Sequence, residues 1–247
     1  MKEELGCIAL PLVPGRHEPN DKSEMVTQLL FGEIYSVLEE QKKWVLIKNT
    51  SDQYECWIDR KQHTPISEKV ELNHKIGSAF APLANGDQTW FLPAGSKVNL
   101  GEFYIGARKF YFDSSNEEEK KGPLFYANQL IGAPYLWGGK SILGIDCSGF
   151  VQVVYSCSGI QLPRDAHQQA EIGETVDFVE TAKAGDLAYF DNEEGRITHV
   201  GIMLDGENII HASGSVRIER IDHEGIYNSE NESYSHRLRI VKRVISG

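Results

Sequence analysis

The sequence predicts an α+β protein in which small β barrels precede a group of helices and a final antiparallel sheet. Three observations predict this fold class. Residues 8–65 form short runs of strand-forming side chains separated by turn formers. Residues 124–131 and 150–155 are apolar at helical spacing, and strand-like runs return after residue 185. Helices followed by antiparallel strands are typical of an α+β domain.

The first half of the chain is expected to contain only strands. Asn49, Thr50, Ser51 and Asp52 suit a hairpin turn, and the spacing of the runs around them fits a small barrel. A weaker strand-and-turn pattern returns between residues 79 and 112. The polar residues 113–123 are typical of a linker. The strands are expected at residues 25–31, 32–40, 43–48, 54–59 and 88–95.

The second half of the chain begins with helical rather than strand-like residue patterns. The helix over residues 124–131 should end at Gly132-Ala133-Pro134, and a second helix should begin near Asp146. Residues 168–172 suit a short third helix. The strands of the final sheet are expected at residues 186–190, 197–204, 208–212, 216–220 and 238–244.

Composition excludes several classes of partner. The 247 residues carry a formal net charge of −11, and nonspecific nucleic-acid binding requires a basic face. No apolar run approaches the roughly 20 residues of a membrane-spanning helix. Four irregularly spaced cysteines are too few for a disulfide scaffold and are expected to be reduced. The acidic start is not a signal peptide as written, which favours the cytoplasm; a removed leader would indicate the periplasm or cell envelope.

Cys147 stands directly after Asp146, where the second helix should start. The unpaired N–H groups and positive dipole of a helix N-terminus favour a thiolate and lower the pKa of a cysteine there. Such a thiolate is a candidate nucleophile, and adjacent N–H groups can stabilise an oxyanion. The alternative is a small buried core residue, which is a common setting for cysteine. Cys7, Cys56 and Cys157 are expected to be structural.

His199 and His211 lie on two neighbouring predicted strands joined near Asp205-Gly206. A loop centred on residue 205 would pair the two histidines directly on one face, with Cβ atoms about 5 Å apart. One imidazole could then act as a base while the other orients it. A two-residue turn would instead put them on opposite faces of the sheet.

A zinc site is a further option for these side chains. Cys147, His199 and His211 could ligate the ion, but the sequence has no closely spaced Cys or His pair. We therefore expect neither a metal nor another cofactor. The remaining histidines are scattered and expected to be exposed: His17, His63, His74, His167, His223 and His236.

Six short motifs follow one another in the second half of the chain. They are YLWGG at 135–139, GIDCSGF at 144–150, LPRD at 162–165, AGDL at 184–187, HVGI at 199–202 and IHA at 210–212. Their order and spacing resemble the NlpC-type cysteine peptidases of bacterial cell-wall metabolism. The resemblance implies a papain-like α+β core with Cys147 as nucleophile, His199 as base and His211 as the orienting residue.

The first half resembles bacterial SH3-like barrels. One barrel is expected over residues 1–65, a second and more divergent one with the linker over 66–122, and the peptidase domain over 123–247. This arrangement is similar to dipeptidyl-peptidases that cut γ-D-glutamyl to diamino-acid bonds and require a free N-terminal L-alanine. In such enzymes the first barrel forms one wall of the substrate cleft.

The resemblance also implies roles for further residues of the second half. The Tyr135 hydroxyl would help to form the oxyanion hole. Asp146 and Ser148 flank the nucleophile and would contact the D-glutamyl portion. Asp165 would receive the substrate ammonium, and Ala166 stands where a serine usually follows, which removes one hydrogen bond to the substrate.

Two residues of the first barrel match cleft positions of the family. Tyr54 corresponds to a cleft tyrosine and Glu33, more weakly, to a cleft glutamate. The alternatives are a barrel-surface aromatic and a solvated charge.

We therefore expect a thiol peptidase that acts on murein tripeptides or tetrapeptides, needs no cofactor and works as a monomer. Diaminopimelate and lysine both remain open as the third residue of the peptide. One alternative is a general endopeptidase or amidase on the same core. Another is an inactive module that binds wall peptides. The presence of Cys147, both histidines and Tyr135 argues against a decayed enzyme, and Asp165 argues for a peptide amine.

Overall fold

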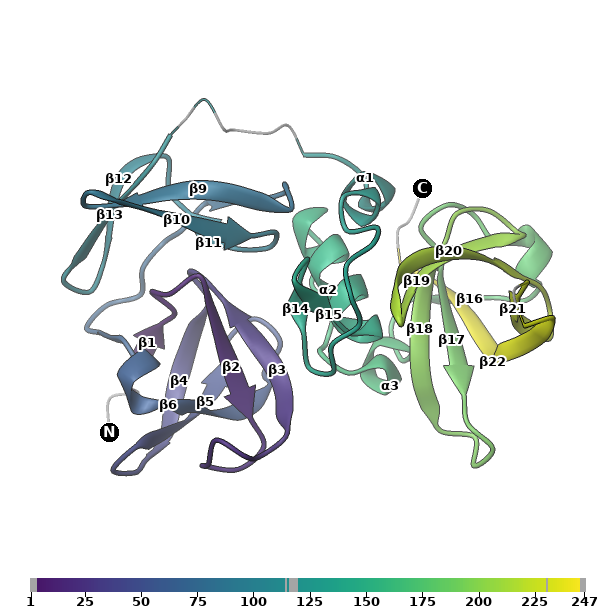
Figure 1. The fold of residues 1–247 in the computed structure, drawn as a ribbon, viewed down its shortest axis with the longest axis horizontal. Helices are drawn as coiled ribbons and strands as arrows, with labels where there is room; N and C mark the ends of the chain where they lie inside the picture. The colour runs from purple at the N-terminus through teal and green to yellow at the C-terminus, as the bar shows by residue number, and fades with distance from the viewer. Residues whose placement is uncertain (1–3, 114, 116–119, 230, 245–247) are drawn as a thin grey trace.

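The computed structural model describes residues 4–113, 115, 120–229 and 231–244. Figure 1 shows two β units, coloured purple to teal, on one side of a small group of helices. A larger β structure, coloured green to yellow, lies on the other side of these helices. None of the described helices combines the length and apolar character needed to cross a membrane.

The first β unit is a seven-stranded antiparallel sheet with strand order β3-β2-β6-β5-β4-β1-β7. Alternate side chains of its strands face inward, so Val45 and Ile47 pack with Ile8, Tyr35 and Ile58. Its elements are β1 (Leu5–Cys7), β2 (Leu12–Arg16), β3 (Met25–Leu30), β4 (Ile34–Glu40), β5 (Trp44–Asn49), β6 (Glu55–Asp59), η1 (Arg60–Gln62) and β7 (Pro65–Ile66).

The second β unit contains a four-stranded sheet, β10-β9-β13-β12, and a two-stranded sheet, β11-β8. Its core includes Phe103 and Phe110 and takes in Phe31 of the first unit, whose ring packs edge-on at 5.1 Å from Phe110. This shared core joins the two β units. The strands are β8 (His74–Lys75), β9 (Phe80–Asn85), β10 (Gln88–Pro93), β11 (Lys97–Val98), β12 (Gly101–Ile105) and β13 (Arg108–Phe112).

The helices lie between the first β unit and the final sheet (Figure 1). Asp146 accepts a hydrogen bond from the Gly149 N–H at 2.6 Å and so starts the central helix at Cys147, as expected. The third helix begins earlier than predicted, because Asp165 is the extended residue that precedes it. The elements are α1 (Pro123–Asn128), β14 (Lys140–Ser141), β15 (Gly144–Ile145), α2 (Cys147–Cys157) and α3 (Ala166–Gln169).

The last sheet has strand order β16-β22-β17-β18-β19-β20-β21, and β22 also pairs with β21. This extra pairing closes six strands into a barrel, where the sequence indicated only an antiparallel sheet. The barrel encloses Phe190, Met203 and Ile209. The elements are β16 (Glu174–Val176), η3 (Val179–Thr181), β17 (Leu187–Asp191), β18 (Ile197–Met203), β19 (Asn208–Ser213), β20 (Ser215–Ile221), β21 (Gly225–Asn228) and β22 (Ser233–Arg243).

Helix α2 is buried along almost its whole length. One side packs on the final sheet, where Val151 and Val154 join a core with Val200 and Ile210. Leu30 of the first β unit belongs to the same core. A helix that is apolar on most sides must be covered by protein on most sides. Because the first β unit and the final sheet both pack on α2, the helix fixes their relative positions.

Candidate active site

Cys147 lies where the start of α2 meets strand β18. Its side chain is 6% exposed, and its sulfur lies 4.0 Å from the carbonyl oxygen of Thr198. The backbone N–H groups of Ser148 and Val200 donate hydrogen bonds to the sulfur. The candidate nucleophile therefore lies beside the strand that carries His199.

Burial controls the ionisation of this thiol. It raises the pKa of Cys147 to about 11, and the charge of Asp146 adds to the rise. The two N–H groups and Arg164 favour the thiolate, but their effect is smaller than that of burial. The N–H group at the helix start lowers this pKa as expected, but burial outweighs it and the net shift is upward, opposite to the expected one. At neutral pH the thiol keeps its proton until a base removes it.

His199 and His211 share one face of the sheet. His211 pairs with Gly201, so the loop is centred on residue 206 and the two histidines are diagonal neighbours. The direct pairing of the two histidines does not occur, because the centre of the loop lies one residue later than residue 205. Asp205 holds this loop by accepting hydrogen bonds from the N–H groups of Glu207 and Asn208. His199 Nε2 and His211 Nδ1 lie 2.8 Å apart and share a hydrogen bond.

Two further side chains contact this histidine pair, and neither was expected there from the sequence. Glu219 on β20 places Oε2 2.7 Å from His211 Nε2. The ring of His236 on β22 stacks on that of His199, with centroids 4.1 Å apart and planes inclined by 26°. Glu219 lies two residues beyond Arg217, the cross-strand partner of His211 in the β19–β20 hairpin, so strand alternation could have indicated it. His236 comes from β22, which reaches the site by pairing with β17 and β21, and no local pattern in the sequence signals it.

The structure corrects the expectation that six histidines are exposed. His17, His167 and His223 are exposed, whereas His63, His74 and His236 are partly buried. Burial lowers the pKa of His236 to about 4. Burial, followed by the two neighbouring histidines, holds the pKa of His199 well below its usual value. The candidate base is therefore uncharged at neutral pH.

The three clustered histidines could be considered as metal ligands, since His199, His211 and His236 have ligand atoms within 4.8 Å of one another. Their nitrogens already serve other contacts, because one links His199 to His211 and another links His211 to Glu219. The rings of His199 and His236 are stacked, so their in-plane lone pairs run side by side and do not converge on one metal position. We assign the cluster to hydrogen bonding between side chains.

A cleft of about 500 Å³ opens beside Cys147. This volume suits a small peptide. Both halves of the chain contribute to its walls, so the first barrel limits the space available to a substrate. The lining residues are Glu24, Val26, Tyr54, Trp137, Asp146, Cys147, Ser148, Arg164, Asp165, Ala166, His167, Ile197 and Thr198.

One part of this cleft is acidic. The Asp165 carboxylate makes no capping bond to α3, and burial raises its pKa. Burial, followed by the charge of Asp165, raises the pKa of Tyr54 to about 12, so the Tyr54 hydroxyl in this cleft stays protonated. Glu24 lines the same cleft and accepts a hydrogen bond from the Trp137 indole N–H at 2.5 Å.

Glu33 lies outside this cleft. It is buried, accepts the Leu30 N–H at 3.0 Å and forms an ion pair with Lys140 at 3.3 Å. It therefore links the first barrel to β14, and it is neither a cleft residue nor a solvated charge. The barrel glutamate that lines the cleft is Glu24, which immediately precedes the strand expected at residues 25–31.

Asp146 and Ser148 lie in the cleft, and both contact Arg164. The Arg164 guanidinium is 2% exposed, forms a two-point ion pair with Asp146 and donates to the Ser148 hydroxyl at 2.8 Å. Tyr135 is half-buried beside the nucleophile. Burial and the charge of Cys147 raise the pKa of Tyr135 to about 12, which keeps its hydroxyl protonated as a hydrogen-bond donor.

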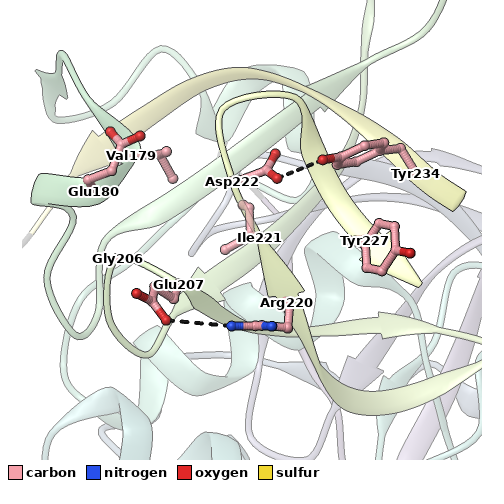
Figure 2. Close-up of a pocket in the computed structure, with 9 residues that line it drawn as sticks. All are labelled: Val179, Glu180, Gly206, Glu207, Arg220, Ile221, Asp222, Tyr227 and Tyr234. Atoms are coloured by element: carbon pink, nitrogen blue, oxygen red, sulfur yellow. Dashed lines mark hydrogen bonds and ion pairs between the residues drawn. The ribbon is translucent and has the colours of Figure 1, made fainter. Parts of the chain in front are cut away.

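A second hollow, of about 470 Å³, lies at an end of the six-stranded barrel (Figure 2). Two pairs of its side chains interact: Glu207 pairs with Arg220 at 3.8 Å, and the Tyr234 hydroxyl donates to Asp222 at 2.7 Å. No cysteine or histidine lines it. Of these two hollows, the cleft at Cys147 is the one that contains a candidate nucleophile.

Comparison with known proteins identifies the family. Residues 132–237 match the NlpC/P60 family, and residues 15–62 match the bacterial dipeptidyl-peptidase SH3 domain. The gamma-D-glutamyl-L-lysine dipeptidyl-peptidase of Bacillus subtilis (strain 168) is 33% identical over 212 residues, covering 75% of this chain and 71% of that protein. The chain belongs to the NlpC/P60 family.

A second sequence relative and a solved structure extend the comparison over more of the chain. A gamma-D-glutamyl-L-lysine dipeptidyl-peptidase of Bacillus cereus (strain ATCC 10987) is 34% identical over 239 residues, covering 80% of this chain and 69% of that protein. The crystal structure of an NlpC/P60 protein from Bacillus cereus has the same fold, with a TM-score of 0.81 at 18% identity. That likeness covers 98% of this chain and all of the other.

These findings confirm the predicted fold class, the predicted family and the predicted class of enzyme. The NlpC/P60 protein is a cysteine peptidase of the cell-wall type. The comparisons do not identify the bond that it cuts or the roles of the individual site residues.

Proposed function

We propose that this NlpC/P60 peptidase cuts the γ-D-glutamyl to L-diamino-acid bond of wall peptides with a free N-terminal L-alanine and releases L-Ala-γ-D-Glu. The observation that carries the proposal is the acidic part of the cleft, where Asp165 and Glu24 lie with the Tyr54 hydroxyl. Two relatives that align with 75% and 80% of this chain are named gamma-D-glutamyl-L-lysine dipeptidyl-peptidases.

A free ammonium is the group that best matches this part of the cleft. The Asp165 carboxylate is partly desolvated and has no capping hydrogen bond, so its charge is costly until a cation arrives. An incoming ammonium offers three donors and a positive charge. A peptide whose amine is acylated brings neither the charge nor the full set of donors, and it should bind poorly.

The first barrel explains why the cleft suits a short peptide. Glu24, Val26 and Tyr54 line the cleft opposite the catalytic half. A stem peptide joined to glycan would have to extend past these side chains. A dipeptide unit bound between Asp165 and Cys147 would instead end at the barrel wall, which favours released peptides over intact cell wall.

The reaction starts from the uncharged Cys147 thiol and the uncharged His199 imidazole. His199 takes the proton of Cys147 as the sulfur attacks the γ-carbonyl carbon. The N–H groups at the start of α2 and the Tyr135 hydroxyl stabilise the oxyanion that forms. His199 then gives its proton to the leaving amine. Water, deprotonated by His199, hydrolyses the thioester and releases L-Ala-γ-D-Glu.

Product analysis tests the proposal. The protein should release L-Ala-γ-D-Glu from L-Ala-γ-D-Glu-L-Lys or from the diaminopimelate peptide, as followed by mass spectrometry. Cys147→Ala should abolish release, whereas Cys157→Ala, at the other end of α2, should remain active. Release of free alanine, or equal activity of the two variants, would contradict the proposal.

A further inference from the structure

We infer that Glu219 is a positioning residue that sets the tautomers of His211 and His199, leaving the Nδ1 lone pair of His199 for the Cys147 proton. The inference rests on the proposed roles of Cys147 and His199. It concerns a side chain on β20 that neither the sequence motifs nor the comparisons indicated.

Three side chains form the hydrogen-bonded series on which the inference depends. Glu219 Oε2 lies 2.7 Å from His211 Nε2, and His211 Nδ1 lies 2.8 Å from His199 Nε2. His211 is fully buried, and the Glu219 side chain is only 11% exposed. The contacts are therefore shielded from competition by water.

The direction of each hydrogen bond follows from the carboxylate at one end. An ionised Glu219 can only accept, so His211 must carry its proton on Nε2. The Nδ1 atom of a neutral His211 is then an acceptor, and His199 Nε2–H donates to it. The remaining nitrogen of His199, Nδ1, is left without a proton and can act as the base.

The charges around Glu219 support its ionised form. The hydrogen bond from His211 lowers the pKa of this carboxyl group. Arg217 on β20 approaches its other oxygen at 3.3 Å, and the rings of His211 on β19 and His236 on β22 lie near it. A carboxylate that is paired on both oxygens stays in place, which keeps His211 in one orientation.

The carboxylate has a second effect during turnover. When His199 accepts the thiol proton, a positive charge forms on its buried ring. Its Nε2–H then points through His211 toward the negative charge of Glu219. Removing this charge should disfavour the imidazolium and lower the pKa that governs the acid side of the pH profile.

Glu219→Gln tests this account because it keeps the shape and removes the charge. Its amide can donate to His211 Nε2 and so reverse the series of hydrogen bonds. We expect kcat to fall by about 10- to 100-fold with KM changed less than about twofold. The acid limb of the pH profile should move to lower pH. Glu207→Gln, in an exposed pair with Arg220 at 3.8 Å, should leave both measurements unchanged.

The tautomer itself can be measured without any substrate. In wild-type protein labelled with ¹⁵N-histidine, NMR should show His211 protonated on Nε2 and His199 on Nε2. Protonation of His211 on Nδ1 would overturn the inference even if Glu219→Gln failed to fold. A loss of activity in Glu219→Gln without movement of the acid limb would also overturn it, because it would indicate a structural role. Failure of the proposed substrate would leave the NMR result unaffected.

Discussion

Arg164 and Asp146 form a two-point ion pair immediately beneath the start of helix α2. The same carboxylate accepts the backbone N–H groups of Gly149 in α2, at 2.6 Å, and of Gly138 in the preceding loop, at 2.8 Å. One aspartate therefore joins the helix, the loop and the arginine. Cys147, the next residue in the chain, takes its position from this arrangement.

Removing the arginine should leave a buried charge without its partner. We expect Arg164→Met to lower the free energy of unfolding by about 3–5 kcal/mol, measured by urea denaturation. Arg220→Met is a matched control, because it removes an exposed pair with Glu207 and should cost less than about 1 kcal/mol. Equal losses in the two variants would contradict this account of the ion pair.

Gly201 keeps space open for His211 on the neighbouring strand. A Cβ at this position would lie 2.8 Å from His211 Cβ and 2.7 Å from Ile209 Cδ1, so the strands would have to shift. We expect Gly201→Ala to destabilise the fold by about 1–3 kcal/mol and to lower kcat. Thermal melts and steady-state kinetics give the two values.

Gly122→Ala is the control for this substitution, since no atom lies within 4 Å of its added Cβ. It should melt within a few degrees of the wild type and retain full activity. An active Gly201→Ala protein would show that the His199–His211 contact tolerates displacement.

The raised pKa of Cys147 predicts slow thiol modification at neutral pH. Because burial raises this pKa to about 11, the thiolate fraction keeps increasing up to that pH. The rate of iodoacetamide alkylation at Cys147, followed by mass spectrometry, should therefore still rise between pH 8 and 10. A rate that levels off below pH 7 would instead indicate a resting thiolate–imidazolium pair.

His236 covers one face of the candidate base. Its ring lies 4.1 Å from that of His199, and its removal would leave an open space over the imidazole. We expect His236→Ala to lower kcat by about tenfold and His236→Phe, which can still stack, to lower it less. Equal kinetic defects in the two variants would indicate that the His236 nitrogens, rather than its packing, matter.

The parts of the site that depend on local sequence could be predicted. Asp146 is a good capping residue, and it starts α2 at Cys147. His211 pairs with Gly201, two residues from His199, so the two histidines share a face of the sheet as expected, although they do not pair directly. Local rules sufficed here because each relationship lies within one hairpin or one helix turn.

The parts that depend on long-range packing could not be predicted. His236 reaches the histidine pair because β22 pairs with both β17 and β21, a closure that no local alternation encodes, whereas Glu219 reaches His211 through the β19–β20 hairpin. Glu24 lines the cleft, whereas Glu33 pairs with Lys140 outside it. Which barrel glutamate reaches the cleft depends on how the first barrel packs against the catalytic half. The pKa of Cys147 likewise depends on its burial in the folded protein, which outweighs the helix terminus.

The central claim is that the cleft selects a free amine through Asp165, and comparing free with N-acetylated L-Ala-γ-D-Glu-L-Lys tests it most directly. The wild type should cleave the free peptide at least about 100-fold faster, by kcat/KM, because acetylation removes the charge that Asp165 meets. Asp165→Asn should lower kcat/KM on the free peptide by about two to three orders of magnitude and narrow this ratio. Asp177→Asn, an exposed aspartate outside the cleft, should change neither value. Equal cleavage of the two peptides by the wild type would contradict the claim and indicate a general endopeptidase.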